Sequence, residues 1–280
     1  MWQCKIAPSL GEGFAGTPNE VWGTAKYNNS DIPAVFFGLY GLPDFYSLWR
    51  HKGRKAVLWA GSDLTHFKNG YWLDNDGSIS LSPKPLAKWL EKNCENWVEN
   101  EVEADILRSF GIKPKVCPSF LGDIDFYQES FIPTDNPKVY LSVSGNYFEE
   151  YGWDLIERVA DKVPEVKFYL YGSSKWQSQH DNVIVRGRLP QAEMDEEISK
   201  MQCGLRLNKV DGFSEVTAKS VLWGQYPIVR KEFGYPHLDA FETEEELIEL
   251  LKCLKNKKEP NKAREEYRKL LNNYPWNARR

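Results

Sequence analysis

The stretch that decides the fold runs from Cys203 to Val229 and reads CGLRLNKVDGFSEVTAKSVLWGQYPIV. Its first residues, 203–208, are mostly apolar and predict a short buried strand. A polar loop follows, and Ser214 is a residue type that caps helix N-termini. A helix closed by Gly224 and a second strand at 226–229 then complete a βαβ unit. Such a unit places its loop at the carboxyl edge of a parallel sheet, where α/β proteins bind phosphates and nucleotides.

Strands and helices alternate through the rest of the chain, which indicates an α/β protein with parallel, doubly wound sheets. In the second half the pattern predicts strands at 138–143, 167–171 and 183–185, and helices at 153–163, 190–201, 243–254 and 263–271. The first half is less regular. It predicts strands at 2–6, 34–39 and 55–59, and helices at 45–50 and 97–110.

A linker divides the two halves. The segment Ser130–Asn136 and the two prolines Pro133 and Pro137 are typical of a connection between domains. We therefore expect a first domain at 1–133, a second at 134–258, and a final helix within 259–280 that returns to the first domain. A chain of 280 residues is long enough for two such domains.

Composition excludes several classes of function. Charged residues make up 27% of the chain and the formal net charge is −4, so no electrostatic footprint for nucleic acid is apparent. The five cysteines are scattered without CxxC spacing, which argues against a disulfide framework or a zinc site and for a reducing compartment. The N-terminus lacks the pattern of a signal peptide and no stretch approaches membrane-spanning length, so we expect a cytoplasmic protein.

The unit at 203–229 resembles the donor-sugar site of GT-B glycosyltransferases of the group 1, glycogen-synthase-like family. In that family an acidic residue, a glycine and a phenylalanine or small residue precede a second acidic residue, and a glycine and Pro-Val-Ile follow. The matching positions are Asp211, Gly212, Phe213, Ser214, Lys219, Gly224 and Pro227-Ile228-Val229. The resemblance is specific over 138–254 and loose over the first 133 residues. It implies two Rossmann-like domains that face each other across a cleft.

The resemblance also implies roles for residues around this loop. Asp211 would hold the transferred sugar as a catalytic residue, and backbone N–H groups at the helix start would attract a diphosphate. We expect the donor to contact Arg206, Asn208, Lys209, Gly212, Phe213, Ser214 and Lys219. The alternative for this loop is an ordinary Asp-Gly turn followed by a helix cap.

Two departures from the family concern charge. Lys219 occupies the position of the second acid, which in the family holds the nucleotide ribose, and lysine has no acceptor atom for those hydroxyls. Two interpretations of Lys219 remain open. Either its ammonium contacts the diphosphate as a point charge, or donor recognition has been lost in this protein. The family's arginine and lysine after the first strand of this domain are also missing from 144–147. Possible replacements are Arg186, Arg188, Arg206, Lys209 and Lys219.

The first half carries a weaker signal. The segment 59–64, Trp-Ala-Gly-Ser-Asp-Leu, is similar to the family's His-Gly-Ser-Asp-Leu segment, with Ala60 where the family has histidine. Asp63 would then face the acceptor as a catalytic residue; its alternative is a turn or helix cap. The glycine-rich loop at 11–16 would face the donor phosphates, with Gly11 and Gly13 in contact.

Two DxD triplets offer a competing interpretation. Asp74-Asn75-Asp76 and Asp123-Ile124-Asp125 have the form that binds a divalent metal and a nucleotide diphosphate in the GT-A fold. The first triplet and Gly77 are also the residue choice of a tight turn. We expect no metal and no cofactor, with a nucleotide diphosphate sugar as co-substrate. The eleven tryptophans fit a sugar-stacking surface or an aromatic core.

Two hypotheses of function follow. The first is a glycosyltransferase that moves a sugar from a nucleotide diphosphate sugar to a hydroxyl acceptor, with retention of configuration as the resemblance implies. The acceptor remains open among glycan, lipid, protein and modified base. The second is a catalytically silent GT-B-like nucleotide- or sugar-binding scaffold, which rests on Ala60, Lys219 and the missing arginine and lysine.

Overall fold

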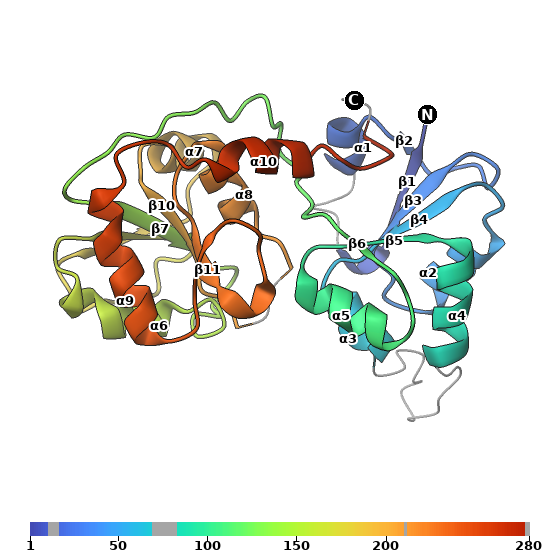
Figure 1. The fold of residues 1–280 in the computed structure, drawn as a ribbon, viewed down its shortest axis with the longest axis horizontal. Helices are drawn as coiled ribbons and strands as arrows, with labels where there is room; N and C mark the ends of the chain where they lie inside the picture. Colours follow the sequence, from blue (N-terminus) through green and yellow to red (C-terminus); the bar gives the residue numbers. More distant parts are fainter. Residues whose placement is uncertain (11–16, 69–82, 210–211, 278–280) are drawn as a thin grey trace. The chain divides into compact units, whose positions relative to one another are not determined.

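The computed structural model of the chain describes residues 1–10, 17–68, 83–209 and 212–277 (Figure 1). Contacts divide it into two compact units. The first consists of Met1–Asp123 together with Leu270–Arg280, and the second of Ile124–Lys269. Gly11, Gly13, Asp74, Asp76 and Asp211 lie outside the described residues.

The described part of the first unit contains a parallel six-stranded sheet in the order β2-β1-β3-β4-β5-β6. Its central strands are short, and β3 is apolar and buried throughout, as expected for a parallel sheet covered on both sides. The strands are β1 (Gln3–Ile6), β2 (Ala25–Lys26), β3 (Ala34–Phe37), β4 (Lys55–Leu58), β5 (Glu95–Val98) and β6 (Lys115–Val116).

Helices cover one face of this sheet and pack into one hydrophobic core with β3, β4 and β5. They are α2 (Leu42–Arg50), α3 (Ser62–Lys68), α4 (Pro83–Asn93) and α5 (Glu101–Ser109). The other face packs against α1 (Thr17–Trp22) and the C-terminal segment, where Trp22, Trp97, Tyr274 and Trp276 form an aromatic cluster. Most of the described tryptophans here are therefore core residues.

The predicted helix at 97–110 is wrong at its start. Trp97 and Val98 belong to β5, where Trp97 pairs with Leu58 of β4. The helix begins only after Asn100, whose side chain accepts a hydrogen bond from the Glu103 N–H. The apolar residues 97 and 98 fit a buried strand as well as a helix face, because a short apolar run does not distinguish the two.

The second unit contains a parallel six-stranded sheet in the order β12-β11-β10-β7-β8-β9. The strands are β7 (Lys138–Ser142), β8 (Lys167–Tyr171), β9 (Val183–Gly187), β10 (Cys203–Arg206), β11 (Ile228–Arg230) and β12 (Asp239–Phe241). The chain runs outward from β7 to β9 and then returns to the other side of β7 as β10. The sheet therefore reverses its order between β7 and β10, and such a switch point is where open α/β sheets bind ligands.

Helices lie on both faces of the second sheet, which is the doubly wound arrangement that the sequence predicts. Figure 1 shows α6 (Trp153–Val159) and α9 (Glu244–Cys253) on one face, and α7 (Gln191–Ile198) and α8 (Glu215–Leu222) on the other. The last helix, α10 (Ala263–Leu270), ends where the chain passes to the first unit. Short 3₁₀ turns extend α6 and α9 at Ala160–Lys162 and Leu254–Asn256.

The βαβ unit that the sequence predicts is confirmed as β10, α8 and β11. The Ser214 hydroxyl caps α8 by accepting the Thr217 N–H at 3.2 Å. The helix ends before Gly224, which has φ +81, a left-handed conformation that glycine adopts without strain. At the strand, the Gly204 N–H donates to the Ser220 hydroxyl at 3.0 Å, so α8 packs close to β10.

The boundaries of the two units differ slightly from the predicted domain boundaries. Residues 124–133 belong to the second unit, where the Ser130 N–H donates to the Trp223 carbonyl and Tyr127 packs against Trp223. Most of α10 belongs to this unit as well. The passage to the first unit is made by the segment after the helix, where the Tyr274 hydroxyl donates to the Cys117 carbonyl.

Among the described residues, no helix has the length and apolar character that crossing a membrane requires.

Candidate functional site

A pocket of about 510 Å³ lies at the carboxyl edge of the second sheet. Its walls come from the ends of β7 and β8, the loop after β9, and one side each of α7 and α8. The lining residues are Ser142, Val143, Tyr171, Gly172, Arg188, Leu189, Pro190, Gln191, Met194, Ile198, Glu215, Val216 and Lys219. The pocket therefore lies near the switch point of this sheet, which is where open α/β sheets bind ligands.

Gly172 allows the strand ends to meet at the floor of this pocket. It has φ +102, and a Cβ placed there would lie 2.1 Å from the Val143 carbonyl oxygen. Its N–H donates to the Gly187 carbonyl at 2.8 Å. Only glycine combines this backbone conformation with so close an approach. Gly172 is not among the site residues predicted from the sequence, although a glycine directly after the apolar strand 167–171 is a signal for it.

A second glycine joins the loops that follow β7 and β10. Gly152 has φ +75, and a Cβ there would lie 2.4 Å from the Cβ of Leu207. Beside this contact, the Lys209 N–H donates to the Glu150 carbonyl at 3.0 Å. These contacts hold the beginning of the β10–α8 loop against the β7–α6 loop.

Lys219 lines the pocket but is paired with a carboxylate. Its Nζ lies 2.8 Å from Oδ1 of Asp195 in α7, and only 9% and 10% of the two side chains are exposed. The same oxygen accepts a hydrogen bond from Gln191 Nε2 at 2.8 Å. The Lys219 Nζ also lies 5.5 Å from the centre of the Tyr127 ring. The ammonium is therefore fixed by α7 and by the segment before the second sheet.

Asp195 is not among the residues predicted from the sequence. The signal for it is its position on α7, three residues before Ile198, which is fully buried. A carboxylate on the buried face of a helix calls for a cationic partner. In this protein the partner comes from the neighbouring helix.

The pocket is suited to an anionic ligand with an apolar portion. Lys219 and Arg188 contribute positive charge beside the carboxylate of Glu215, and the N-termini of α7 and α8 both border the space. Val143, Leu189, Pro190 and Met194 supply an apolar wall. A diphosphate joined to a flat ring has this combination of properties.

The other cationic and amide residues predicted to bind the donor lie beside the pocket rather than in its lining. Arg206 is half-buried, with its guanidinium carbon 5.6 Å from the centre of the Tyr151 ring. Asn208 is buried and Lys209 is exposed. Among the predicted donor residues that the structure describes, Lys219 is the one in the pocket lining.

Gly212 and Phe213 make contacts within the second unit. The Gly212 carbonyl accepts a hydrogen bond from the Tyr235 hydroxyl. The Phe213 ring stacks on Tyr267 at 6.0 Å and meets Tyr235 edge-on at 5.4 Å. Phe213 and the capping Ser214 therefore support the loop and the helix start. Asp211, the predicted sugar-holding residue, lies outside the described residues.

Asp63 of the first unit is fully buried at the start of α3. Its two carboxylate oxygens accept hydrogen bonds from the Leu39 N–H at 2.8 Å and the Ala60 N–H at 3.0 Å. Burial raises the pKa of this carboxyl to about 7, although the backbone hydrogen bonds lower it. In this arrangement Asp63 joins the ends of β3 and β4. A direct contact with an acceptor stays a prediction.

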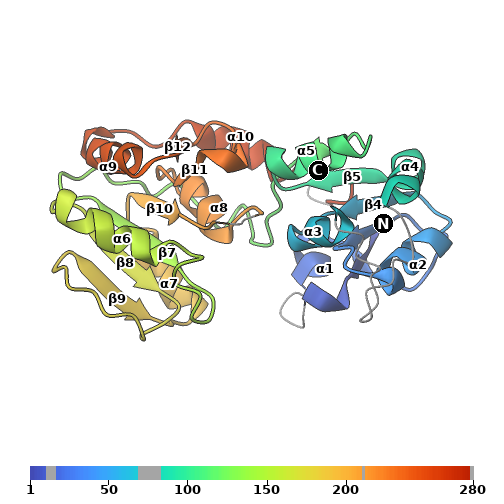
Figure 2. The same ribbon diagram turned by 90° about the horizontal axis from the view of Figure 1, so that it is seen from below.

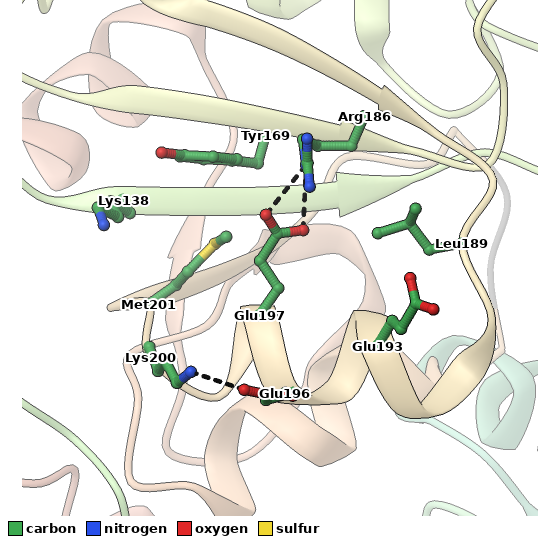
Figure 3. A pocket seen from close by; sticks show the side chains of 9 residues that line it. All are labelled: Lys138, Tyr169, Arg186, Leu189, Glu193, Glu196, Glu197, Lys200 and Met201. Atoms are coloured by element: carbon green, nitrogen blue, oxygen red, sulfur yellow. Dashed lines mark hydrogen bonds and ion pairs between the residues drawn. The ribbon is translucent and has the colours of Figure 1, made fainter.

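A second hollow, of about 330 Å³, lies between α7 and the edge of the sheet at β8 and β9. Figure 3 shows that its charged groups face one another: Arg186 Nε lies 3.0 Å from Glu197 Oε1, and Lys200 Nζ lies 3.0 Å from Glu196 Oε1. The Tyr171 hydroxyl also donates to Glu197, at 2.7 Å. Arg186 is thus engaged outside the larger pocket.

The structure describes one of the two DxD triplets. Asp125 Oδ1 lies 2.9 Å from Arg268 Nη2, within the second unit. In the described part of the chain, no group of three or more His, Cys, Asp and Glu side chains is arranged to hold a metal ion.

Comparison with known proteins identifies the fold. No protein-family model and no curated protein sequence matches the chain. Among solved structures, Alr3699/HepE of Anabaena in complex with UDP matches 96% of this chain and 95% of its own, with a TM-score of 0.57 and 11% identity. Sucrose-phosphate synthase of Thermosynechococcus elongatus matches 94% of this chain and 73% of its own, with a TM-score of 0.57 and 13% identity.

A third structure, TarM, has a TM-score of 0.55 and 14% identity. The match covers 81% of this chain, which spans 49% of the TarM chain. Together with the two parallel sheets, these likenesses show that the chain has the GT-B fold of glycosyltransferases. This fold is the one that the resemblance in sequence implies.

Proposed function

We propose that this protein is a glycosyltransferase that moves a sugar from a nucleotide diphosphate sugar to a hydroxyl acceptor, with retention of configuration. The observation that carries the proposal is the 510 Å³ pocket at the switch point of the second sheet, where Lys219 and Arg188 meet two helix N-termini. The complexes of Alr3699/HepE with UDP and with UDP-glucose, which share the fold, support a donor of this class.

The proposed pocket chemistry rests on charge. Lys219 has three N–H donors, one of which goes to Asp195, so two remain for oxygens of a ligand. Arg188 is an exposed second cation in the pocket lining, and the N-terminus of α8 adds the positive end of a helix dipole. These groups would stabilise the negative charge that develops on the leaving diphosphate.

In the proposed reaction, the bond between the sugar's anomeric carbon and the diphosphate oxygen breaks, and the diphosphate keeps the electron pair. The acceptor oxygen forms the new bond on the same face of the sugar and loses its proton to an oxygen of the leaving phosphate. The protein contributes positioning and charge stabilisation. We assign the sugar hydroxyls to Asp211 and no cofactor to the reaction.

Donor binding is the first test. Calorimetry with UDP, GDP, ADP and dTDP should find a nucleotide that binds, and Lys219→Met should weaken it by about tenfold or more, because a charged contact is lost. Lys200→Met is a matched control, since Lys200 is an exposed lysine of the same unit outside this pocket. Donor-dependent release of nucleoside diphosphate tests the transfer. Absence of binding across the nucleotide panel would contradict the proposal.

A second candidate is a GT-B-like scaffold that binds a nucleotide or sugar without turnover. The observation that favours it is the pairing of Lys219 with Asp195, which partly neutralises a cation of the pocket. The two candidates differ in one measurement. A scaffold binds the nucleotide but releases no nucleoside diphosphate from any donor, with or without added glycan, lipid or protein acceptors.

A further inference from the structure

Helix α2 exposes an apolar and aromatic stripe. Leu42, Tyr46 and Trp49 are 50%, 51% and 54% exposed, and their spacing places them on one face of the helix. The opposite side of the helix is anchored by Leu48, which is fully buried in the core of the first unit. Single exposed apolar side chains are ordinary, but three large ones on one helix face are the mark of an interaction surface.

Exposed cations lie at the end of α2 and on the neighbouring helix α4. Arg50 and Lys52 follow it along the chain, and α4 carries Lys84, Lys88 and Lys92, which repeat every four residues and so lie along one face. The two helices are neighbours on the same face of the sheet (Figure 2). The rings of Phe45 and Trp89 meet edge-on between them at 5.4 Å. We call these three apolar residues and five cations the α2–α4 face.

Acidic side chains of the two helices do not counter this charge. Asp44 is buried and accepts the Tyr40 N–H, and Glu91 is half-buried and accepts the Lys113 N–H at 2.7 Å. Arg50 lies against the stripe, with its guanidinium carbon 5.4 Å from the centre of the Tyr46 ring and Nη1 donating to the Tyr46 hydroxyl. The face therefore combines protruding apolar groups with local positive charge on a protein whose net charge is −4.

We propose that the α2–α4 face docks on an anionic phospholipid surface. Tryptophan and tyrosine favour the headgroup region of a bilayer, because their rings are apolar and their N–H and O–H groups stay hydrated. Lysine and arginine attract the lipid phosphates, and their aliphatic stems cover apolar surface. Nucleic acid would bind the cations but would leave the protruding Leu42 without an apolar contact. A lipid surface would contact both the cations and the apolar residues, so it explains more of the face.

The test is sedimentation of the full chain with vesicles. We expect binding to vesicles of phosphatidylcholine mixed with phosphatidylglycerol, weak binding to phosphatidylcholine alone, and loss of binding at high salt. Trp49→Ala and the pair Lys88→Glu with Lys92→Glu should each weaken binding to the anionic vesicles by about tenfold or more. Because all three side chains are exposed, the thermal unfolding midpoint should stay unchanged.

Matched controls come from the second unit. Phe126→Ala removes an aromatic side chain that is 66% exposed, and Lys167→Glu reverses an exposed cation, and neither should change vesicle binding. Equal binding to both kinds of vesicle, or variants of the α2–α4 face that bind like the unaltered protein, would overturn the proposal. Absence of vesicle binding would also overturn the proposal, whether or not the protein binds a single-stranded RNA and the variants of the α2–α4 face lose that RNA binding.

Discussion

The ammonium of Lys219 and the carboxylate of Asp195 form a buried ion pair, 2.8 Å apart, between two neighbouring helices of the second unit. The pair borders the pocket proposed for the donor. Its presence explains how a lysine is held where the resembling family has an acid. At the position of the family's second acid α8 carries Lys219, and the carboxylate that contacts it is Asp195 of α7.

Removal of Asp195 should destabilise the protein. Asp195→Ala leaves the Lys219 ammonium buried without its partner, and we expect a loss of about 3 kcal/mol in the free energy of unfolding. Urea denaturation measures it. Glu196→Ala is the matched control, because it removes the partner of Lys200 in an exposed pair and should cost less than about 0.5 kcal/mol. Equal losses in the two variants would contradict a stabilising role for the buried pair.

Exchange of the two charges should rescue a damaged single variant. Lys219→Glu brings a second carboxylate against Asp195, so it should reduce stability more than Lys219→Met does. Combining Lys219→Glu with Asp195→Lys restores an ion pair, and we expect a coupling free energy of at least about 1 kcal/mol. Urea denaturation of both single variants and the double variant checks this. Additive losses would show that the two side chains do not interact.

Gly172 should tolerate no side chain. Gly172→Ala forces a Cβ toward the Val143 carbonyl oxygen, 2.1 Å away, in a left-handed backbone conformation. We expect a loss of more than about 2 kcal/mol in the free energy of unfolding and weaker nucleotide binding, because the backbone at the pocket floor must move. Gly111→Ala separates the effect of the steric contact from the effect of the left-handed backbone conformation. Gly111 has φ +84 but open space around its Cβ, so it should cost only about 1 kcal/mol. Equal costs would exclude the steric contact as the cause.

Asp63 should make stability depend on pH. Its pKa is about 7 in the folded protein because the carboxyl is buried, against about 3.9 when unfolded. Between these values the folded state holds a proton that the unfolded state has lost. The contribution of Asp63 to the free energy of unfolding is therefore largest below pH 4, falls as the pH rises to about 7, and is constant above it.

Asp63→Asn provides the comparison for this pH dependence. Asparagine does not titrate, so the difference in unfolding free energy between the two proteins should change between pH 4 and 7 and become constant above about 7. Asparagine also keeps one acceptor oxygen for the Leu39 or Ala60 N–H. A difference that is independent of pH would mean that the carboxyl titrates normally.

Metal dependence tests the chemistry of the proposed function. If cations and helix N-termini hold the diphosphate, donor turnover should survive a strong chelator. Asp123→Asn and Asp76→Asn should change turnover little, whereas Asp211→Asn should cost about 2 kcal/mol of transition-state stabilisation. Steady-state kinetics on each variant measures this. Turnover that is lost on chelation and restored by manganese would favour one of the DxD triplets as a metal site.

Local sequence signals predicted much of the second unit. The apolar strand at 203–206, the capping Ser214 and Gly224 after α8 are short-range features, and each acts within one turn or one strand. The alternation of such elements is enough to indicate a doubly wound parallel sheet. The first unit was harder, because Trp97 and Val98 lie in a short apolar run that suits a strand or a helix, and pairing with β4 decides between them.

The βαβ unit, the helix caps and the α/β class follow from the order of residues alone, because they depend on neighbouring residues. Other features depend on how the elements pack. The tertiary structure paired Lys219 with Asp195 across two helices, brought Gly172 against Val143, and buried Asp63 between two strand ends. The contacts of Lys219 with Asp195, of Gly172 with Val143 and of Asp63 with Leu39 join residues that are distant in sequence. Their energies depend on burial and on distances between atoms, which exist only once the sheets and helices are packed.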